Sequence, residues 1–340
     1  MKDTFQIVIT AQQEAAVIAL GEIIKYDSRA FSSKLSSETQ LVTVPNGYFA
    51  LLKELQNTIF IRHIFPVQIV TPVDIYDLDQ QLIDLCGNLP KVEAFSIQMR
   101  CYSSSVVRDR MLSLIKAIEQ GLLLRGYICN DKQPVWVLSL YIHENEMYAG
   151  VSSCVDNLSD WNGGMHRFKK YESFISRAEF KLQEAISAFG IDMKDIVSSN
   201  NKCAVDLGAA PGGWTKILLD YGLHVTAVDP ALLSENIINH PNLIHIRDVA
   251  QNFIGKKDDF AILTNDMRMD MIESCKIMLD MALFLSPGSI ALITLKLPHN
   301  QWYKKTKRAL SILKNKYIIQ NVRQLFHNRS EVTVYLKKLD

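Results

Sequence analysis

The chain has 340 residues, too many for one ordinary small domain, so two or three folded units are expected. Apolar residues make up 48% and charged residues 21%, which is typical of a soluble protein with a hydrophobic core. No charge-free apolar run could span a bilayer, and residues 1–17 lack the features of a secretory signal. The six cysteines form no C-x-x-C pair, which argues against a zinc site or a disulfide framework and predicts reduced thiols in a cytoplasmic protein without a metal.

The net charge of +1 conceals an uneven distribution of charge along the chain. Residues 295–340 contain eleven Lys and Arg against two acids, a local balance of +9, so the other residues carry about −8. A basic region inside a neutral protein suits a polyanionic partner better than a membrane or a small anion. A solvated helix face would explain the same residues equally well.

Residues 1–63 alternate between short strand-like and helix-like segments. Apolar runs predict strands over 5–10 and 40–45, and amphipathic runs predict helices over 13–26 and 48–58. We expect a small α+β module there, without a recognisable chemical motif.

Residues 64–155 form a second expected unit. The pattern predicts a helix over 77–89, a strand over 94–102, a long helix over 106–126 and a hairpin over 135–153. This order resembles a THUMP domain, an RNA-binding module, with "RCYSS", the long helix and "YAGVS" at the corresponding places. Without the resemblance, the segment is an α/β module of no stated function.

A polar, glycine-bearing linker is predicted over 156–171, followed by regular strand–helix alternation over 172–340. Alternation of this kind predicts an α/β fold with a doubly wound, mostly parallel sheet. Two adjacent β-rich runs near the end predict one antiparallel strand. The expected strands lie within 203–208, 224–229, 243–248, 260–266, 289–296, 317–326 and 331–338.

A glycine-rich loop, "GAAPGGW" at 208–214, lies between the first of these strands and a helix-like segment. Glycines allow a tight turn and a close approach of the backbone, and Asp229 follows Gly208 by 21 residues, at the offset of a ribose-binding acid. Together these features predict a nucleotide-like cofactor. Ala210 and Pro211 interrupt the G-x-G-x-x-G pattern, so no pyrophosphate cradle is predicted.

"DLGAAPGGW" resembles the S-adenosylmethionine loop of the FtsJ-type ribose methyltransferases. The resemblance implies a cofactor site in which Asp229 holds the ribose, Asp248 lies near the adenine and Asp266 borders the site. An ordinary acid in a turn after a strand explains Asp248 equally well. The loop residues implied to contact the cofactor are Gly208, Ala210, Pro211, Gly212, Gly213 and Trp214.

Methyl transfer to a ribose 2′-hydroxyl requires a base, because the hydroxyl is a very weak acid. A lysine can serve if burial or a second cation lowers its pKa. Three candidate residues lie at strand ends, where doubly wound folds place their sites, although each alone would be an ordinary surface residue. The FtsJ-type family has a Lys-Asp-Lys-Glu tetrad that matches Lys181, Asp266, Lys296 and Glu331, and Lys296 is the expected base.

Two other reactions, both of them methylation of a base, are expected to show different residues: an N-P-P-Y-like turn after the fourth strand for an exocyclic amine, and a nucleophilic cysteine near the site for a pyrimidine carbon. The segment after the fourth strand reads "NDMRMD" rather than an N-P-P-Y-like turn, and Cys275 and Cys203 fall in a helix and at the start of a strand. The basic segment 299–316 carries Trp302 and Tyr303 among its cations, which suits RNA, although packing against the sheet would also explain the two aromatic residues.

The segments "NLSDWNGG", "SRAEFKLQEA" and "VRQLFHNRSEVTVYLKK" extend the likeness to the THUMP-bearing ribosomal RNA ribose methyltransferases. That resemblance implies an RNA partner and a cytidine in large-subunit ribosomal RNA as the target. Ala178 departs from it, since that family has a serine there near the cofactor. Two other functions stay open: methylation of a small-molecule hydroxyl, and RNA binding by a protein that has lost catalysis.

Overall fold

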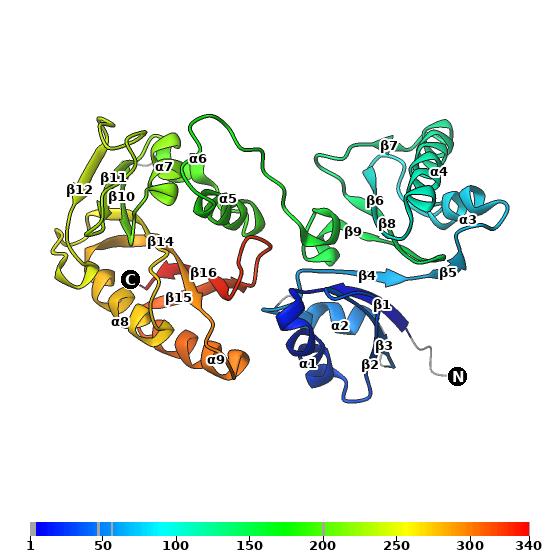
Figure 1. Ribbon diagram of the computed structural model, residues 1–340, viewed down its shortest axis with the longest axis horizontal. Helices are drawn as coiled ribbons and strands as arrows, with labels where there is room; N and C mark the ends of the chain where they lie inside the picture. Colours follow the sequence, from blue (N-terminus) through cyan, green and yellow to red (C-terminus); the bar gives the residue numbers. More distant parts are fainter. Residues whose placement is uncertain (1–4, 46–47, 56, 199–200, 340) are drawn as a thin grey trace. The chain divides into compact units, whose positions relative to one another are not determined.

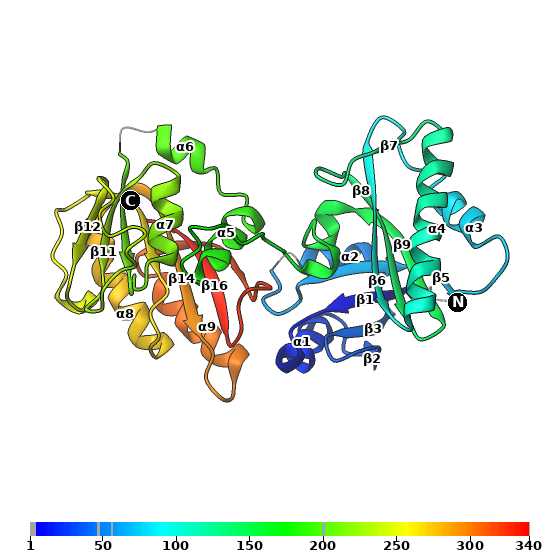
Figure 2. The same cartoon turned by 45° about the horizontal axis from the view of Figure 1, so that its top comes forward.

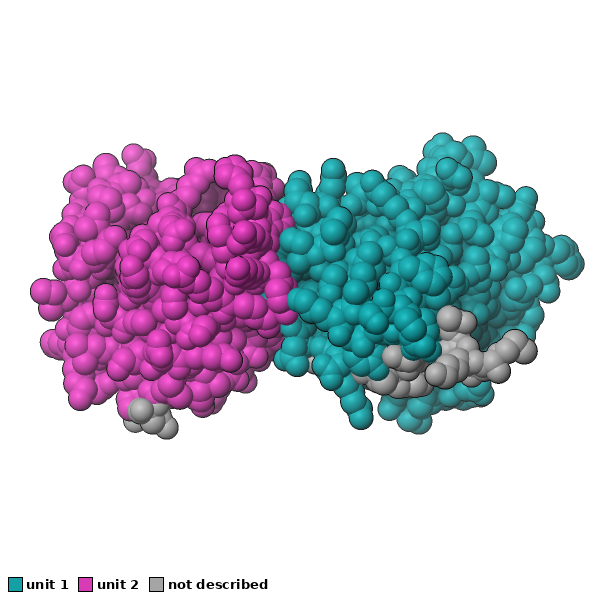
Figure 3. Space-filling view, turned by 90° about the horizontal axis from the view of Figure 1, so that it is seen from below, with its two compact units in different colours: residues 1–166 teal, residues 167–340 magenta. Residues whose placement is uncertain are grey.

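The computed structural model describes residues 5–45, 48–55, 57–198 and 201–339. Within it the chain divides into two compact units, residues 1–166 and 167–340, coloured separately in Figure 3. The division falls inside the segment expected to be a linker. No helix among the described residues is long and apolar enough to cross a membrane.

The first unit contains two sheets. Its four-stranded antiparallel sheet has the order β2 (Phe31–Lys34), β3 (Thr39–Val44), β1 (Phe5–Thr10) and β4 (His63–Val67). The sheet therefore extends four residues past the module boundary expected at residue 63. The helices α1 (Ala16–Tyr26) and α2 (Tyr48–Leu55) belong to the same part of the chain.

The second sheet of this unit has five strands and is accompanied by one long helix and one short helix. The strand order is β5 (Ile69–Pro72), β9 (Glu146–Ser153), β8 (Trp136–His143), β6 (Ala94–Tyr102) and β7 (Ile128–Cys129). The helices are α3 (Leu78–Leu85) and α4 (Ser105–Leu124). Apolar side chains such as Leu82, Ile118 and Leu140 fill the core of this part.

The second unit is built on one seven-stranded sheet (Figure 1). Its order is β12 (Leu243–Ile246), β11 (His224–Val228), β10 (Cys203–Leu207), β13 (Phe260–Asn265), β14 (Leu285–Lys296), β16 (Glu331–Lys338) and β15 (Tyr317–Arg323). Strand β16 runs antiparallel to both of its neighbours, and the other pairs are parallel. The predicted doubly wound α/β sheet with one antiparallel strand is confirmed.

Helices cover both faces of this sheet. In the views of Figures 1 and 2, α5 (Ala178–Ala188), α6 (Met193–Ser198) and α7 (Gly213–Asp220) lie on one side, and α8 (Met271–Met281) and α9 (Trp302–Leu313) on the other. Because each face is covered, central strands such as β10 and β13 consist almost wholly of buried residues.

The strand order reverses between β10 and β13, and this position determines where a ligand can bind. The segments that leave the carboxyl ends of these two strands diverge to opposite faces, and in open α/β sheets ligands bind in the crevice that results. The glycine-rich loop follows β10, and Asp266 follows β13. The two features that the sequence singled out therefore lie at the same edge of the sheet.

Candidate active site

Four charged residues from four separate elements meet at the carboxyl edge of the central strands. Lys181 comes from α5, Asp266 follows β13, Lys296 ends β14, and Glu331 begins β16. The antiparallel register of β14 and β16 places Lys296 directly opposite Glu331. The sheet thus fixes three of the four backbones, and only Lys181 is supplied by a helix.

The four side chains form a closed ring of ion pairs. The Nζ atom of Lys181 lies 3.0 Å from Oδ2 of Asp266 and 2.6 Å from Oε1 of Glu331. The Nζ atom of Lys296 lies 2.7 Å from Oδ1 of Asp266 and 2.5 Å from Oε2 of Glu331. Each carboxylate bridges both ammonium groups, so two negative charges face two positive charges.

Burial strengthens these ion pairs, because little water remains to screen the charges. The exposed side-chain fractions are only 8% for Glu331 and 20% for Lys296. Burial by itself would lower the pKa of Lys181, but attraction by Asp266 and Glu331 outweighs it, and the pKa is raised. Burial would likewise raise the pKa of Asp266, but Lys296 and Lys181 hold it below its usual value. Lys181 is therefore held protonated and Asp266 ionised.

Thr294 is a further member of the cluster that the sequence analysis did not identify. Its hydroxyl donates to Oδ1 of Asp266 at 2.5 Å and accepts from Nζ of Lys296 at 2.7 Å. The two-residue spacing on β14 places Thr294 and Lys296 on the same face of the strand, so the period of a strand could have predicted this neighbour.

Asp206 is a second residue that the sequence analysis overlooked, and it lies on β10 beneath the glycine-rich loop. Its carboxylate accepts hydrogen bonds from the hydroxyls of Thr215 and Thr264, at 2.7 and 2.8 Å. Burial raises the pKa of Asp206 to about 7, against a usual 3.8, even though these hydrogen bonds favour the ionised form.

The glycines of the loop are required by neighbouring parts of the protein. Gly208 and Gly212 have φ values of +70° and +115°, which disfavour any side chain. A Cβ at Gly208 would lie 2.5 Å from the Met267 side chain, and one at Gly212 would lie 2.3 Å from Ile237. The Ala210–Pro211 bond is cis. The loop backbone is thus pressed against the segment after β13, which carries Asp266.

Asp229 and Asp248 occupy different surroundings. The half-buried Asp229 carboxylate accepts from the backbone N–H of Ala210 at 3.1 Å and of Ala231 at 2.8 Å, which ties the end of β11 to the glycine-rich loop. Asp248 is exposed and accepts from the N–H of Val249 at 2.7 Å, as an acid in a turn does. This hydrogen bond is typical of an acid in a turn, and the place of Asp248 near the adenine stays a prediction.

The last loop residue, Trp214, is only 2% exposed, and its indole N–H donates to the carbonyl of Ala178 at 2.8 Å. This bond joins α7 to the first residue of α5. Ala178 therefore contributes its backbone to the attachment of the helix that bears Lys181.

Two cysteines considered for base methylation are not suited to act as nucleophiles. Cys275 is buried in α8, where burial raises the pKa of its thiol to about 12. Burial also raises the pKa of Cys203 at the start of β10. Nucleophilic attack requires a thiolate, so neither residue favours that chemistry.

Helix α9 follows the loop after Lys296 and presents cations to solvent. Its buried residues, among them Ala309 and Leu313, pack toward the sheet, while Lys304, Lys307 and Arg308 are exposed. Trp302 and Tyr303 are half-buried. Three of the basic residues of this region thus share an exposed face of α9, in the same unit as the lysine–carboxylate cluster.

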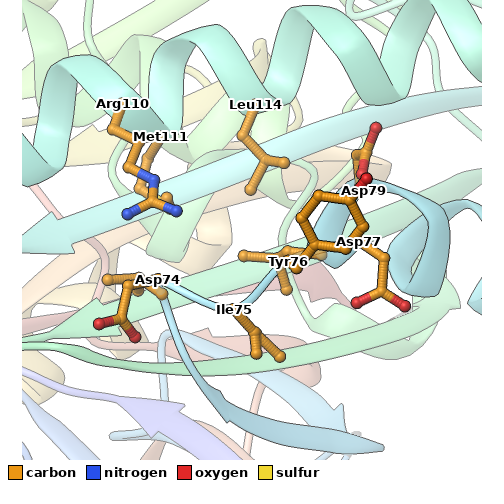
Figure 4. A pocket seen from close by; sticks show the side chains of 10 residues that line it. Asp74, Ile75, Tyr76, Asp77, Asp79, Arg110, Met111 and Leu114 are labelled. Atoms are coloured by element: carbon orange, nitrogen blue, oxygen red, sulfur yellow. The ribbon is translucent and has the colours of Figure 1, made fainter.

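A pocket of about 410 Å³ lies in the first unit, between the loop before α3 and the helix α4 (Figure 4). Arg110 and Leu114 extend from α4 toward a loop that carries Asp74, Tyr76 and Asp77. Three acids, including Asp79, line it against one arginine, so this pocket is poorly suited to a phosphate. Among the described residues, no group of three or more His, Cys, Asp or Glu side chains could hold a metal ion.

The chain is similar to several known proteins. A ribosomal RNA large subunit methyltransferase M of Xylella fastidiosa (strain M23) is 28% identical over 268 residues, covering 75% of each chain. One from Pseudomonas savastanoi pv. phaseolicola (strain 1448A / Race 6) is 30% identical over 233 residues, covering 66% of this chain and 64% of the relative. The crystal structure of TrmN from Thermus thermophilus aligns over 98% of this chain and 100% of that one, with 12% identity and a TM-score of 0.41.

The family model for FtsJ-like methyltransferases matches residues 174–321, a span that includes the glycine-rich loop, Lys181, Asp266 and Lys296. Residues 174–321 are thus an FtsJ-like methyltransferase domain, and the protein is an S-adenosylmethionine-dependent methyltransferase.

Proposed function

We propose that this enzyme methylates a ribose 2′-hydroxyl of RNA, and that its target is a cytidine of large-subunit ribosomal RNA. The observation that carries the proposal is the closed ring of Lys181, Asp266, Lys296 and Glu331 at the edge where the cofactor loop lies. The names of the similar proteins, which are ribosomal RNA large subunit methyltransferases, support RNA as the substrate class.

The residues around the glycine-rich loop suit S-adenosylmethionine. No side chain projects from the loop at Gly208 or Gly212, and the Asp229 carboxylate lies at the end of β11, where it could accept from ribose hydroxyls. Asp266 borders the loop through the contact of Gly208 with Met267. When bound, the cofactor supplies an electrophilic methyl group on a positively charged sulfur.

We assign the proton transfer to Lys296. The amine of Lys296, in its neutral form, would accept the proton of the 2′-hydroxyl while that oxygen takes up the methyl group that the cofactor would supply, leaving the sulfur with the bonding electron pair. Lys181, whose raised pKa keeps it charged, is better suited to neutralise the carboxylates than to accept a proton. Asp266, Glu331 and Thr294 each contact Nζ of Lys296 and would orient it.

RNA would be held by the exposed cations of α9 and by the first unit. Phosphates attract Lys304, Lys307 and Arg308, and unpaired bases can stack on aromatic side chains. For the first unit, we propose the RNA-binding role of a THUMP-like domain over 64–155, preceded by a module at 1–63 and followed by a linker at 156–171. A ribosomal RNA substrate would place the protein in the cytoplasm.

The test is transfer of a labelled methyl group from S-adenosylmethionine to total RNA from cells that lack the protein. The wild type should label one large-subunit fragment, and Lys296→Ala should not. Lys276→Ala is a matched control, because that lysine is exposed on α8 and pairs with Glu273, three residues before it on the same helix. Labelling of a small-molecule extract but not of RNA would identify a small-molecule methyltransferase, and binding of RNA without labelling would identify a protein without catalysis.

A further inference from the structure

The helix α5 has to be fixed against the sheet, because it alone brings a member of the ion-pair ring from outside the sheet. Asp266, Lys296 and Glu331 follow, end or begin strands whose hydrogen bonds set their positions. Lys181 has no such constraint. The distances of the Lys181 ammonium from the two carboxylates, 3.0 and 2.6 Å, therefore depend on where α5 packs.

Glu184 lies one helical turn after Lys181 on the same side of α5. Its carboxylate is 1% exposed and accepts two backbone hydrogen bonds, each of 2.7 Å, from the N–H groups of Phe326 and His327. Those two residues belong to the turn that connects β15 to β16, four to five residues before Glu331.

The turn that Glu184 binds is itself firmly attached to the end of β16. The Asn328 side chain accepts from the N–H of Leu325 at 2.8 Å and from the hydroxyl of Thr333 at 3.0 Å. The N–H of Leu297, next to Lys296, donates to the carbonyl of Ser330 at 2.7 Å. A displacement of the turn would therefore also displace the strand ends that carry Lys296 and Glu331.

We infer that Glu184 is a positioning residue for the methyl transfer: it fixes α5 to the β15–β16 turn, and so sets the distance of Lys181 from Glu331 and Asp266. Burying a carboxylate destabilises the folded protein unless hydrogen bonds replace those it made with water. Two charge-assisted hydrogen bonds from successive backbone N–H groups provide this compensation for Glu184. The chain of contacts runs from Glu184 to the turn, from the turn to Glu331, and from Glu331 back to Lys181.

Glu179 provides a matched control on the same helix. Its side chain is fully buried (0% exposed) and also accepts from two backbone N–H groups, of Ile175 at 2.6 Å and of Ser176 at 3.1 Å. These donors lie immediately before α5, and the carboxylate also accepts from the hydroxyl of Tyr171 at 2.7 Å, so Glu179 ties the start of its helix to the segment that precedes it. Glu179→Gln should reduce stability as Glu184→Gln does, without releasing α5 from the turn.

The inference rests on the proposed function for one of its two readouts. In single-turnover methylation of RNA at saturating cofactor, well below the melting temperature, Glu184→Gln should lower the rate at least tenfold and shift the pH–rate profile, with RNA affinity unchanged. Glu179→Gln should keep the rate within twofold and the profile in place. Equal rate losses in the two variants, or a normal rate and profile in Glu184→Gln, would overturn the inference.

The second readout is independent of catalysis. The side-chain ammonium of Lys181, labelled with 15N, is titrated by NMR in the full-length protein. The carboxylates raise its pKa, so Glu184→Gln should bring that pKa back toward its usual value and Glu179→Gln should not. An unchanged pKa of Lys181 in Glu184→Gln would refute the positioning role, whether or not the wild type methylates RNA. A wild type that methylates no RNA would refute the proposed function but not the positioning role. Should the Gln variant fail to fold, Glu184→Asp, which keeps the charge but shortens its reach, is expected to give the same result in both readouts.

Discussion

Lys181 and Lys296 contact the same two carboxylates, yet their surroundings differ in ways that separate their proposed roles. Only Lys296 also contacts Thr294, and only Lys296 ends a strand at the edge of the sheet. Lys181 comes from a helix and has a raised pKa. A permanently charged residue could therefore replace Lys181 better than Lys296.

Arginine substitution tests this difference at both positions. Lys296→Arg should lower the single-turnover rate by about a hundredfold to ten-thousandfold, nearly as much as Lys296→Ala, because arginine stays protonated and cannot accept the proton. Lys181→Arg retains the charge and should retain more activity. A Lys296→Arg variant that worked at close to the wild-type rate would show that the base is another group.

Asp206 should make the stability of the protein depend on pH. Its pKa is about 7 in the folded protein and 3.8 in an ordinary exposed acid, so the folded state binds the proton more tightly. This contribution is complete below pH 3.8 and is lost as the pH rises toward 7. The loss is at most roughly 4 kcal/mol, from about 1.4 kcal/mol per unit of pKa.

Denaturant unfolding of Asp206→Asn without cofactor measures this effect, since the amide cannot ionise and Thr215 and Thr264 can rotate their hydroxyls toward it. The variant should be less dependent on pH over that interval. Asp220→Asn, at a side chain that is 52% exposed on α7, should behave like the wild type. An identical pH dependence in Asp206→Asn and the wild type would refute the assignment.

At the scale of elements, the glycine-rich loop is shaped by contacts with other segments. Gly212 has a φ of +115° and would place a Cβ against Ile237, whereas Gly190, after α5, has a φ of +61° and open space around it. A substitution at Gly190 therefore meets only the strain of a positive φ, whereas a substitution at Gly212 meets both that strain and a close neighbour.

Alanine substitution should distinguish the two positions. Gly190→Ala should cost about 1–2 kcal/mol, the strain of a left-handed residue, and leave cofactor affinity unchanged. Gly212→Ala should be less stable still and bind S-adenosylmethionine at least tenfold more weakly, as measured by calorimetry. Equal effects at the two positions would mean that the shape of the loop does not matter for the cofactor.

The strands of the second unit could be predicted because each is a largely apolar run between helical or loop segments, buried in central strands such as β10 and β13 and more exposed in β12 and β15. The antiparallel β16 was also predictable, since its β-branched residues follow directly on those of β15. The helix α5 was not predicted, because "AEFKLQEAISA" mixes charged and apolar residues without a clear period. Strands β4 and β5 were not predicted either. Both lie at the edge of a sheet, where pairing with a distant strand, rather than the local sequence pattern, determines that a strand forms.

The four residues of the lysine–carboxylate ring were predicted from the motif resemblance and from their places at strand ends. The ion pairs that join them could not be predicted from their spacing in the sequence. Asp266 and Lys181 are separated by 85 residues, and their 3.0 Å contact depends on the packing of α5. The buried contacts of Glu184 and Asp206 were inaccessible for the same reason: an acid in a sequence does not reveal which backbone N–H or hydroxyl it will meet.

At the scale of the whole molecule, the two units divide the chain into a part that carries the methyltransferase domain and a part for which we propose RNA binding. The cations of α9 belong to the methyltransferase unit, so RNA binding would involve both. Phosphate contacts release condensed counterions, which makes such binding dependent on salt.

Deleting residues 1–166 should weaken RNA binding far more than S-adenosylmethionine binding. For the full chain, a logarithmic plot of RNA affinity against salt should fall steeply, and the slope should be smaller after the deletion because fewer phosphates are contacted. Filter binding at several salt concentrations gives both quantities. If the shortened protein bound RNA as tightly and with the same slope, the first unit would have no role in delivery.

The central claim is that the methyl group reaches a ribose oxygen. The most direct measurement is digestion of the methylated large-subunit RNA to nucleosides, followed by mass spectrometry with fragmentation of the glycosidic bond. We expect the added 14 mass units to stay with the sugar, as 2′-O-methylcytidine, and to disappear with Lys296→Ala. A methyl group that stays with the base would contradict it.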